Sequence, residues 1–138
     1  MKDVLIVCYG MGCGGAEKSL ISFLNRLPKD RWNVDLIVAN PNGMYMKQIP
    51  STVHFLNNQY ELENFATPMS LLRKKVCNGR DLINQASWQI KSRFLCKNLS
   101  WNEKRWELWG KHLPKLKRRY DLAISYMNGP TNYYVIDK

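Results

Sequence analysis

The stretch that decides the fold runs from Lys2 to Gly15 and reads KDVLIVCYGMGCGG. Its first part, KDVLIVCY, is a continuous apolar run without polar alternation, which is typical of a parallel strand covered on both faces. Glycines at positions 10, 12, 14 and 15 then interrupt the run, and a helical pattern begins at Ala16. A strand that feeds a glycine-rich turn and then a helix predicts the start of a βαβ unit.

The residues after this stretch complete the unit. Apolar residues recur at the spacing of one buried helix face, namely Leu20, Phe23, Leu24 and Leu27. Pro28 ends this predicted helix. Residues 33–39 (NVDLIVA) then predict a second buried strand, which the turn residues 40–43 (NPNG) terminate.

Further along the chain the pattern becomes mainly helical. Residues 52–56 predict a short, weak strand, and helices are predicted from Thr67, over 80–98 and from Ser100. Residues 121–126 (DLAISY) predict another buried strand, and 128–130 open a new helix. We therefore expect one α/β domain over 1–138, a Rossmann-like three-layer domain with a mainly parallel sheet and a basic helical region at 67–119. Because the chain stops soon after a new helix begins, we expect it to be part of a longer protein.

The charge of the chain is concentrated in one segment. The sequence has 21 basic and 11 acidic residues, a net charge of +10, and residues 71–119 hold 14 of the basic but only three of the acidic ones. The partner of this segment should be anionic, whether a nucleic acid, a lipid surface or a charged saccharide-lipid.

Tryptophans at positions 88, 101, 106 and 109 accompany these cations. One interpretation is a solvated helical face above a core that uses tryptophans as large fillers. The other is docking on an anionic membrane surface, which basic side chains and interfacial tryptophans both favour. The docking residues would be Arg73, Lys74, Lys75, Trp88, Arg93, Lys104, Arg105, Trp109, Lys117 and Arg118. We expect no nucleic-acid partner, because the sequence has no DNA- or RNA-binding motif.

Two other classes of site are not expected. The cysteines, at positions 8, 13, 77 and 96, form no C-x-x-C pair, and the histidines, His54 and His112, are far apart, so no metal site is predicted. No apolar run approaches the roughly 20 residues that span a bilayer. The apolar stretch at 4–8 is too short for a signal peptide. The predicted location is cytoplasmic, with peripheral attachment at the inner face of the cell membrane as an option.

The glycine turn is the first candidate for a ligand site. At the start of the helix that follows this turn, free N–H groups and the helix dipole attract anions. Because glycines have no Cβ atom, a ligand can approach the backbone closely. Gly10, Gly12 and Gly15 also satisfy G-x-G-x-x-G, the fingerprint of dinucleotide cofactors. However, the second strand ends in Ala39-Asn40 instead of the acid that holds a ribose, and Asp35 comes too early. The glycines could also serve only a tight turn.

Two motifs carry a resemblance to a known family. The stretch GCGGAEK at 12–18, followed by a helix SLISFLNRL and a strand NVDLIVAN, resembles the start of family 4 glycosyltransferases, whose first loop commonly reads G-G-A-E. The late stretch YDLAISYMNGPT at 120–131 is similar to the family's last strand and loop before the domain crossover. The middle of the chain, 60–119, shows no such match.

The resemblance implies a GT-B fold with two Rossmann-like domains. The N-terminal domain would hold the acceptor, and a C-terminal domain with an E-x7-E pair, which this chain lacks, would bind the nucleotide-sugar. No cofactor or metal ion is implied. The implied donor- and acceptor-binding residues are Gly12, Gly14, Gly15, Glu17, Tyr126 and Asn128. For Glu17, helix capping is the favoured interpretation.

The catalytic residue is unknown, because the loop after residue 126 has no histidine or carboxylate at its tip. Asp121, at the other end of that strand, is expected to be structural. The predicted function is the acceptor half of a hexosyltransferase that moves a sugar from a nucleotide-sugar to a cell-surface glycan or lipid-linked acceptor, inactive on its own. The alternatives are an NAD-type oxidoreductase domain and a non-enzymatic basic module that binds nucleic acid or membrane.

Overall fold

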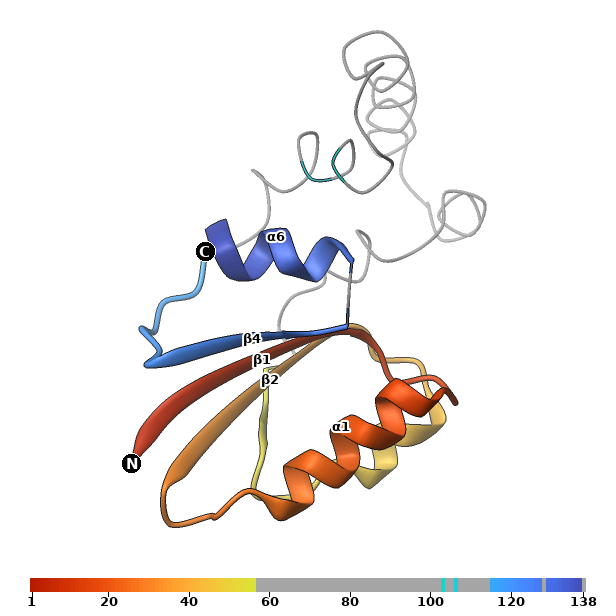
Figure 1. Ribbon diagram of the computed structural model, residues 1–138, viewed down its shortest axis with the longest axis horizontal. Coiled ribbons are helices and arrows are strands. Elements are labelled where there is room, and N and C mark those ends of the chain that lie inside the picture. Colours follow the sequence, from red (N-terminus) through yellow and green to blue (C-terminus); the bar gives the residue numbers. More distant parts are fainter. Residues whose placement is uncertain (57–102, 104–105, 107–114, 128, 138) are drawn as a thin grey trace, which may run out of the picture.

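The computed structural model describes residues 1–56, 103, 106, 115–127 and 129–137 (Figure 1). Most of the helical region predicted at 67–119 lies outside these ranges. Residues 103 and 106 are helical, whereas residues 115–119 are described and form no helix, so the predicted region is too long at its C-terminal end. The described part is an α/β structure with one sheet and two α-helices.

The sheet contains four strands in the order β3-β2-β1-β4, and every described pairing is parallel. β1 (Lys2–Gly10) lies in the interior of the sheet between β2 (Trp32–Asn40) and β4 (Leu122–Tyr126). β3 (His54–Phe55) pairs with the other edge of β2. The apolar runs of β1 and β2 are therefore explained, since both strands are paired on both edges and buried in their central residues.

Among the described α-helices, α1 covers one face of the sheet and α6 the other (Figure 1). Alternate residues of a strand point to opposite faces and so contact different helices. Val4, Ile6 and Cys8 of β1 share a buried cluster with Leu20 and Leu24 of α1 (Gly15–Arg26). The alternate residues Leu5 and Val7 form a second cluster with Tyr134 of α6 (Pro130–Asp137).

The structure corrects three details of the sequence-based expectations. Leu20, Ile21 and Leu24 form the buried face of α1, while Phe23 is 38% exposed at its margin. A 3-10 helix, η1 (Met44–Gln48), which the sequence did not predict, follows the turn after β2 and contacts α1. The weak strand predicted at 52–56 shrinks to the two residues of β3. Within the described ranges, no helix has the length and apolarity needed to cross a membrane.

Candidate functional site

The candidate site lies where the strands end. In a parallel sheet all the carboxyl ends lie on one edge, and ligands bind there in open α/β folds. The register places Gly10 beside Asn40 on β2, and Cys8 beside Tyr126 on β4. The glycine turn after β1 therefore lies between the turn after β2 and the turn after β4.

Glu17 covers the inner side of the glycine turn. Gly14 is the N-cap residue of α1 and, having no side chain, leaves the first turn of the helix without a side-chain cap. A Cβ atom on Gly14 would lie 2.5 Å from a carboxylate oxygen of Glu17, and one on Gly12 would lie 3.6 Å from the other. The half-buried carboxylate thus folds back over the start of its own helix, the position where the helix dipole stabilises an acid. This geometry places a negative charge at the rim of the turn, although Glu17 forms no capping hydrogen bond with the described residues.

The turn after β2 supports the glycine turn from the other side. A Cβ atom on Gly43 would lie 1.8 Å from the carbonyl oxygen of Met11 and 2.8 Å from the amide nitrogen of Gly12. The backbone N–H of Tyr45 donates to the same Met11 carbonyl at 3.2 Å. Met11 itself is fully buried. The path of the glycine turn is therefore set by direct backbone contact with residues 43–45.

Tyr126 joins the end of β4 to α1. Its hydroxyl lies 2.8 Å from Ser19 Oγ, and its ring stacks on Phe23 with centroids 6.4 Å apart. The side chain predicted to touch a substrate is thus half-buried and already has a hydrogen-bond partner. Its register partner on β1 is Cys8, two residues before Gly10, so Tyr126 lies near the same edge of the sheet as the glycine turn.

A small polar cluster shapes the turn after β4. Ser125 Oγ donates to Asn132 Oδ1 at 2.6 Å and lies 2.9 Å from the hydroxyl of the buried Thr131. Between them the backbone turns sharply, with φ of 93° at Met127 and 154° at Gly129. A positive φ is costly for methionine, so the cluster holds this turn in a conformation that the chain alone would not favour.

The structure describes most of the predicted donor- and acceptor-binding residues but few of the predicted membrane-docking residues. Gly12, Gly14 and Gly15 are exposed at the carboxyl edge, with Glu17 and Tyr126 next to them, while Asn128 lies outside the described residues. Most of the predicted membrane-docking residues lie outside the described ranges as well, namely Arg73, Lys74, Lys75, Trp88, Arg93, Lys104, Arg105 and Trp109. Of the accompanying tryptophans, Trp106 packs against the cluster under α6 and stacks on Tyr133, as a core filler would.

Of the predicted docking residues, the structure describes Lys117 and Arg118, and these two side chains have different partners. Lys117 is exposed and forms no ion pair with the described residues. Arg118 instead forms ion pairs with Asp3 and, at 3.6 Å, with Asp35. Its charge is therefore partly neutralised within the fold, and it ties the segment before β4 to β1 and β2.

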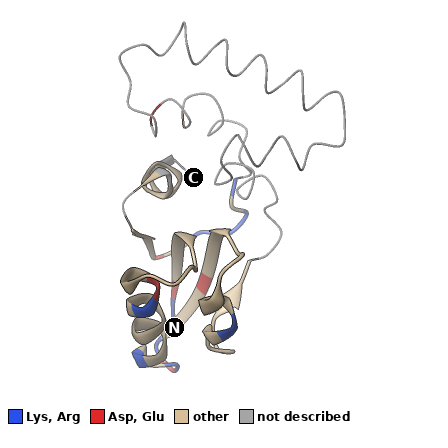
Figure 2. Ribbon diagram, turned by 90° about the vertical axis from the view of Figure 1, so that its right-hand side faces the viewer, with Lys and Arg blue, Asp and Glu red and all other residues tan. Residues whose placement is uncertain are grey.

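Sequence reasoning missed a polar network around Asp35, on the α6 side of the sheet. The Asp35 side chain is only 4% exposed, and its oxygens accept a hydrogen bond from the Tyr120 hydroxyl at 2.6 Å and lie 3.2 Å from His54 Nδ1. Figure 2 shows acidic residues on the strands themselves, and those of β1 and β2 are Asp3 and Asp35. The available signal was an acid inside an apolar strand, which requires partners when it is buried.

The charges of this network shift the pKa values of its members. Hydrogen bonds from the Arg118 guanidinium and then from Asn33 hold the pKa of Asp3 below its usual range. Burial, together with the hydrogen bond to Asp35, raises the pKa of the Tyr120 phenol, so the hydroxyl remains protonated and donates. Asp121 accepts from the Asp3 backbone N–H at 2.7 Å, a structural role. The cluster holds the strands together at the edge opposite the glycine turn.

The two described thiols have different environments. Cys8 is buried in β1, and burial, assisted by the charge of Glu17, raises its pKa to about 12. Cys13 is exposed in the glycine turn. In the described part of the chain, no three His, Cys, Asp or Glu side chains come together as a metal site would require.

No family model, curated protein or solved structure matches the chain. The function must therefore be argued from the residues and their arrangement.

Proposed function

We propose that the chain is the acceptor-side domain of a glycosyltransferase of GT-B architecture, with a Rossmann-like three-layer fold. The parallel sheet, with β1 in its interior and a helix on each face, supports this proposal. So does the resemblance of the G-G-A-E turn and of the late strand and loop to family 4 enzymes. Under this proposal, residues 67–119 form a basic helical region of the same domain.

The observation that carries the proposal is the position of the exposed glycine turn. It lies at the carboxyl end of β1, with the turn after β4 beside it, joined through Ser19 and Tyr126. The two stretches that resemble the family are separated by about a hundred residues, yet they meet at the edge where ligands bind in such folds. If the two stretches resembled the family only by chance, there would be no reason for them to lie together at this edge.

The chemistry of this edge suits a sugar and its diphosphate. Exposed backbone N–H groups of residues 12–15 and the dipole of α1 would attract the diphosphate. The Glu17 carboxylate, already a neighbour of Gly14, would accept hydrogen bonds from sugar hydroxyls at the rim of the turn. Transfer itself would need a separate donor domain, so residues 1–138 alone should show little turnover.

Nucleotide-sugar binding tests one part of the proposal, namely that the glycine turn contacts the diphosphate of a donor held mainly by the separate donor domain. A panel of UDP-, GDP- and ADP-sugars, with NAD as the competing ligand, would be titrated into ¹⁵N-labelled protein. We expect at least one nucleotide-sugar to shift the amide signals of Gly12, Gly14 and Gly15. Gly14→Val, whose side chain must displace the Glu17 carboxylate, should abolish these shifts. Ser22→Val, the same side chain at an exposed position of α1, should preserve them. Binding of NAD in preference to every nucleotide-sugar would point to an oxidoreductase domain instead.

A transfer assay tests whether sugar transfer needs a second domain. Radiolabelled nucleotide-sugars would be incubated with the chain and a membrane extract, and label in glycan or glycolipid would be counted. Incorporation by residues 1–138 alone, above the level of the Gly14→Val variant, would contradict the need for a second domain.

Membrane docking extends the proposal to the basic segment, residues 71–119. A lipid-linked acceptor would be presented most easily to a domain held at an anionic surface. Co-sedimentation should show binding to vesicles that contain phosphatidylglycerol, weakening with added salt. Equal binding to neutral phosphatidylcholine vesicles, or no binding to either, would remove this part of the proposal.

A further inference from the structure

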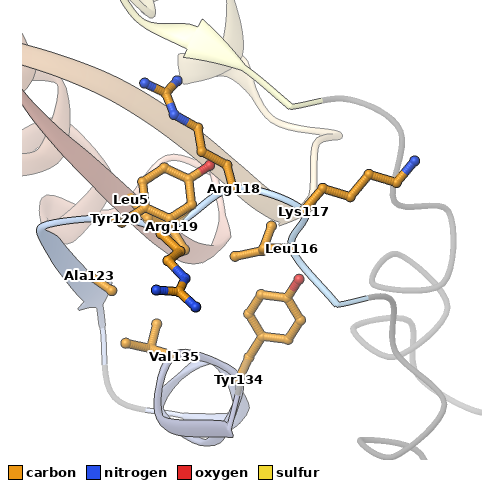
Figure 3. Close-up of a pocket in the computed structure, with 9 residues that line it drawn as sticks. All are labelled: Leu5, Leu116, Lys117, Arg118, Arg119, Tyr120, Ala123, Tyr134 and Val135. Atoms are coloured by element: carbon orange, nitrogen blue, oxygen red, sulfur yellow. The ribbon is translucent and has the colours of Figure 1, made fainter.

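A second concave site lies on the α6 face of the sheet, away from the glycine turn. It has a volume of about 490 Å³ and is lined by Leu5, Leu116, Ala123, Tyr134 and Val135, together with residues 117–120 (Figure 3). Leu5 precedes Gly10 by five positions on β1. At roughly 3.3 Å per residue, the two positions are roughly 16 Å apart. The volume falls in the range of small-molecule sites, roughly 300–1,000 Å³.

The floor and one wall of this pocket are apolar. Leu5 and Tyr134 belong to the buried cluster under α6, and Leu116 and Val135 pack against the same cluster. Ala123, opposite Leu5 in the register of β1 and β4, contributes only a methyl group and so leaves space. Such a surface accommodates the hydrocarbon part of a ligand.

The charged wall is built from three consecutive cations, Lys117, Arg118 and Arg119, and none of the described lining residues is acidic. Figure 3 shows the Arg119 side chain extending toward α6, whereas those of Lys117 and Arg118 lead away from it. Arg118 is engaged by Asp3 and Asp35. Arg119 has no ion pair or hydrogen bond with any residue of the described ranges. The guanidinium that faces the pocket is thus the uncommitted one.

The neighbours of Arg119 fix its backbone in place. Arg118 on one side forms its ion pair with Asp35 at 3.6 Å, and Tyr120 on the other side donates to the same carboxylate at 2.6 Å. Both neighbours are therefore anchored to one buried acid of β2. A cation held in this way loses less freedom when it binds an anion, which favours specific binding.

We propose that this pocket binds a small amphiphilic anion, whose phosphate or carboxylate pairs with Arg119 and whose hydrocarbon part lies on Leu5, Ala123 and Val135. A guanidinium offers parallel N–H donors that match either head group. The site uses neither the glycine turn nor any step of sugar transfer, so its failure would leave the proposed nucleotide-sugar binding intact. Its three cations do belong to the basic segment proposed to dock on membranes.

Titration with matched eight-carbon probes tests the pocket. Octyl phosphate and octanoate, below their micelle concentrations, would be compared with neutral octyl glucoside and with inorganic phosphate. We expect one or both amphiphilic anions to bind and to shift the NMR signals of Leu5, Ala123 and Val135, and the tighter anion identifies the head group. Octyl glucoside and inorganic phosphate, each lacking one half of the required chemistry, should bind at least about tenfold more weakly.

Two variants test which cation binds the anion. Arg119→Met, which keeps the length of the side chain, should weaken anion binding about tenfold or more, because a charge-assisted hydrogen bond is lost. Lys117→Met removes the same charge from a side chain that leads away from the pocket, so its effect should stay within about twofold, the size of a screened surface charge effect. Equal weakening by both variants, or equal affinity for octyl glucoside and octyl phosphate, would overturn the proposal.

A third variant tests the cavity itself. Ala123→Phe should fill the space beside Leu5 while leaving Arg119 in place, and should abolish binding of both anions. Because Ala123 and Arg119 are exposed, these variants should retain the fold, which circular dichroism and the dispersion of the NMR spectrum would verify. Undiminished binding by a folded Ala123→Phe protein would also overturn the proposal.

Discussion

A methyl group on Gly43 would lie 1.8 Å from the Met11 carbonyl oxygen and 2.2 Å from its carbonyl carbon. Neither atom belongs to a flexible side chain, so the backbone itself would have to move. We expect Gly43→Ala to lower the free energy of unfolding by about 1–3 kcal/mol, the usual cost of overpacking. Urea denaturation followed by circular dichroism would measure the difference.

Gly15→Ala is the matched control for this prediction. Gly15 is the first residue of α1, and nothing lies within 4 Å of its added Cβ atom. The same substitution should therefore be neutral or stabilising by up to about 1 kcal/mol, since it restricts the unfolded chain. Equal destabilisation by both variants would show that the contact with Met11 is not the cause.

Asp3 provides a pH-dependent test at the same scale. Its folded-state pKa lies below the ordinary value of 3.8, chiefly through the hydrogen bond from Arg118. The unfolded chain therefore takes up a proton on Asp3 before the folded chain does. The stabilisation is fully present above pH 3.8 and is lost as the pH falls through the lowered folded-state pKa.

The variant Asp3→Asn isolates this effect. We expect wild type to unfold at higher urea concentration than Asp3→Asn at pH 6, and the difference to shrink steadily as the pH falls below about 4. Asp30→Asn, at an exposed position before β2, should leave the urea midpoint nearly unchanged throughout. A difference between wild type and Asp3→Asn that stays constant down to pH 2.5 would contradict the lowered pKa.

At the scale of elements, the hydrogen bond between Ser19 and Tyr126 joins α1 to β4. A double-mutant cycle with Ser19→Ala and Tyr126→Phe measures it, because each change removes one hydroxyl while the phenylalanine ring can still stack on Phe23. We expect each single variant to lose about 0.5–1.5 kcal/mol and the double variant to lose no more than either alone. Fully additive losses would mean that the two hydroxyls do not interact.

The helices and strands also show which features of the fold can be predicted from local sequence patterns. The strands at 2–9, 33–39 and 121–126 were predicted within a residue or so of β1, β2 and β4. The apolar runs of β1 and β2 identify strands covered on both faces. The prediction that 121–126 is buried was wrong, because β4 has two exposed and three half-buried residues. The helical spacing of Phe23 did not bury it, because the buried face of α1 is centred on Leu20, Ile21 and Leu24 and leaves Phe23 at its margin, stacked on Tyr126. η1 was missed because its residues MYMKQ have no cap or period that marks a single turn.

At the scale of the whole molecule, the site was predictable where it depends on topology and unpredictable where it depends on long-range contacts. The glycine turn and the end of β4 meet because parallel strands place their carboxyl ends together, which sequence alone implies. By contrast, no local pattern connects Asp35 with Tyr120, which is 85 residues away, or Gly43 with Met11. The uncommitted Arg119 is visible only once the partners of Arg118 and Tyr120 are known.

Asp35 contacts residues from several parts of the sheet, and its replacement tests how these parts are held together. It contacts His54 of β3, Tyr120 and Arg118, and so links one edge of the sheet with the segment that leads into β4. Asp35→Ala would leave the Tyr120 hydroxyl and part of the Arg118 charge without this partner and would open a cavity in β2. We expect a loss of roughly 1–3 kcal/mol in the free energy of unfolding, because the half-buried Tyr120 hydroxyl loses its partner while the exposed Arg118 keeps Asp3.

Two further variants separate the causes of that loss. Tyr120→Phe removes only the hydrogen bond and should cost about 1 kcal/mol. Asp30→Ala, the same truncation at an exposed position, should change the stability by less than about 0.5 kcal/mol. If Asp35 links the two edges of the sheet, amide hydrogen exchange in the Asp35→Ala variant should accelerate in both β3 and β4. Acceleration confined to β3, with a loss no larger than that of Asp30→Ala, would show that the network is a local contact and that β4 is held by its pairing with β1 alone.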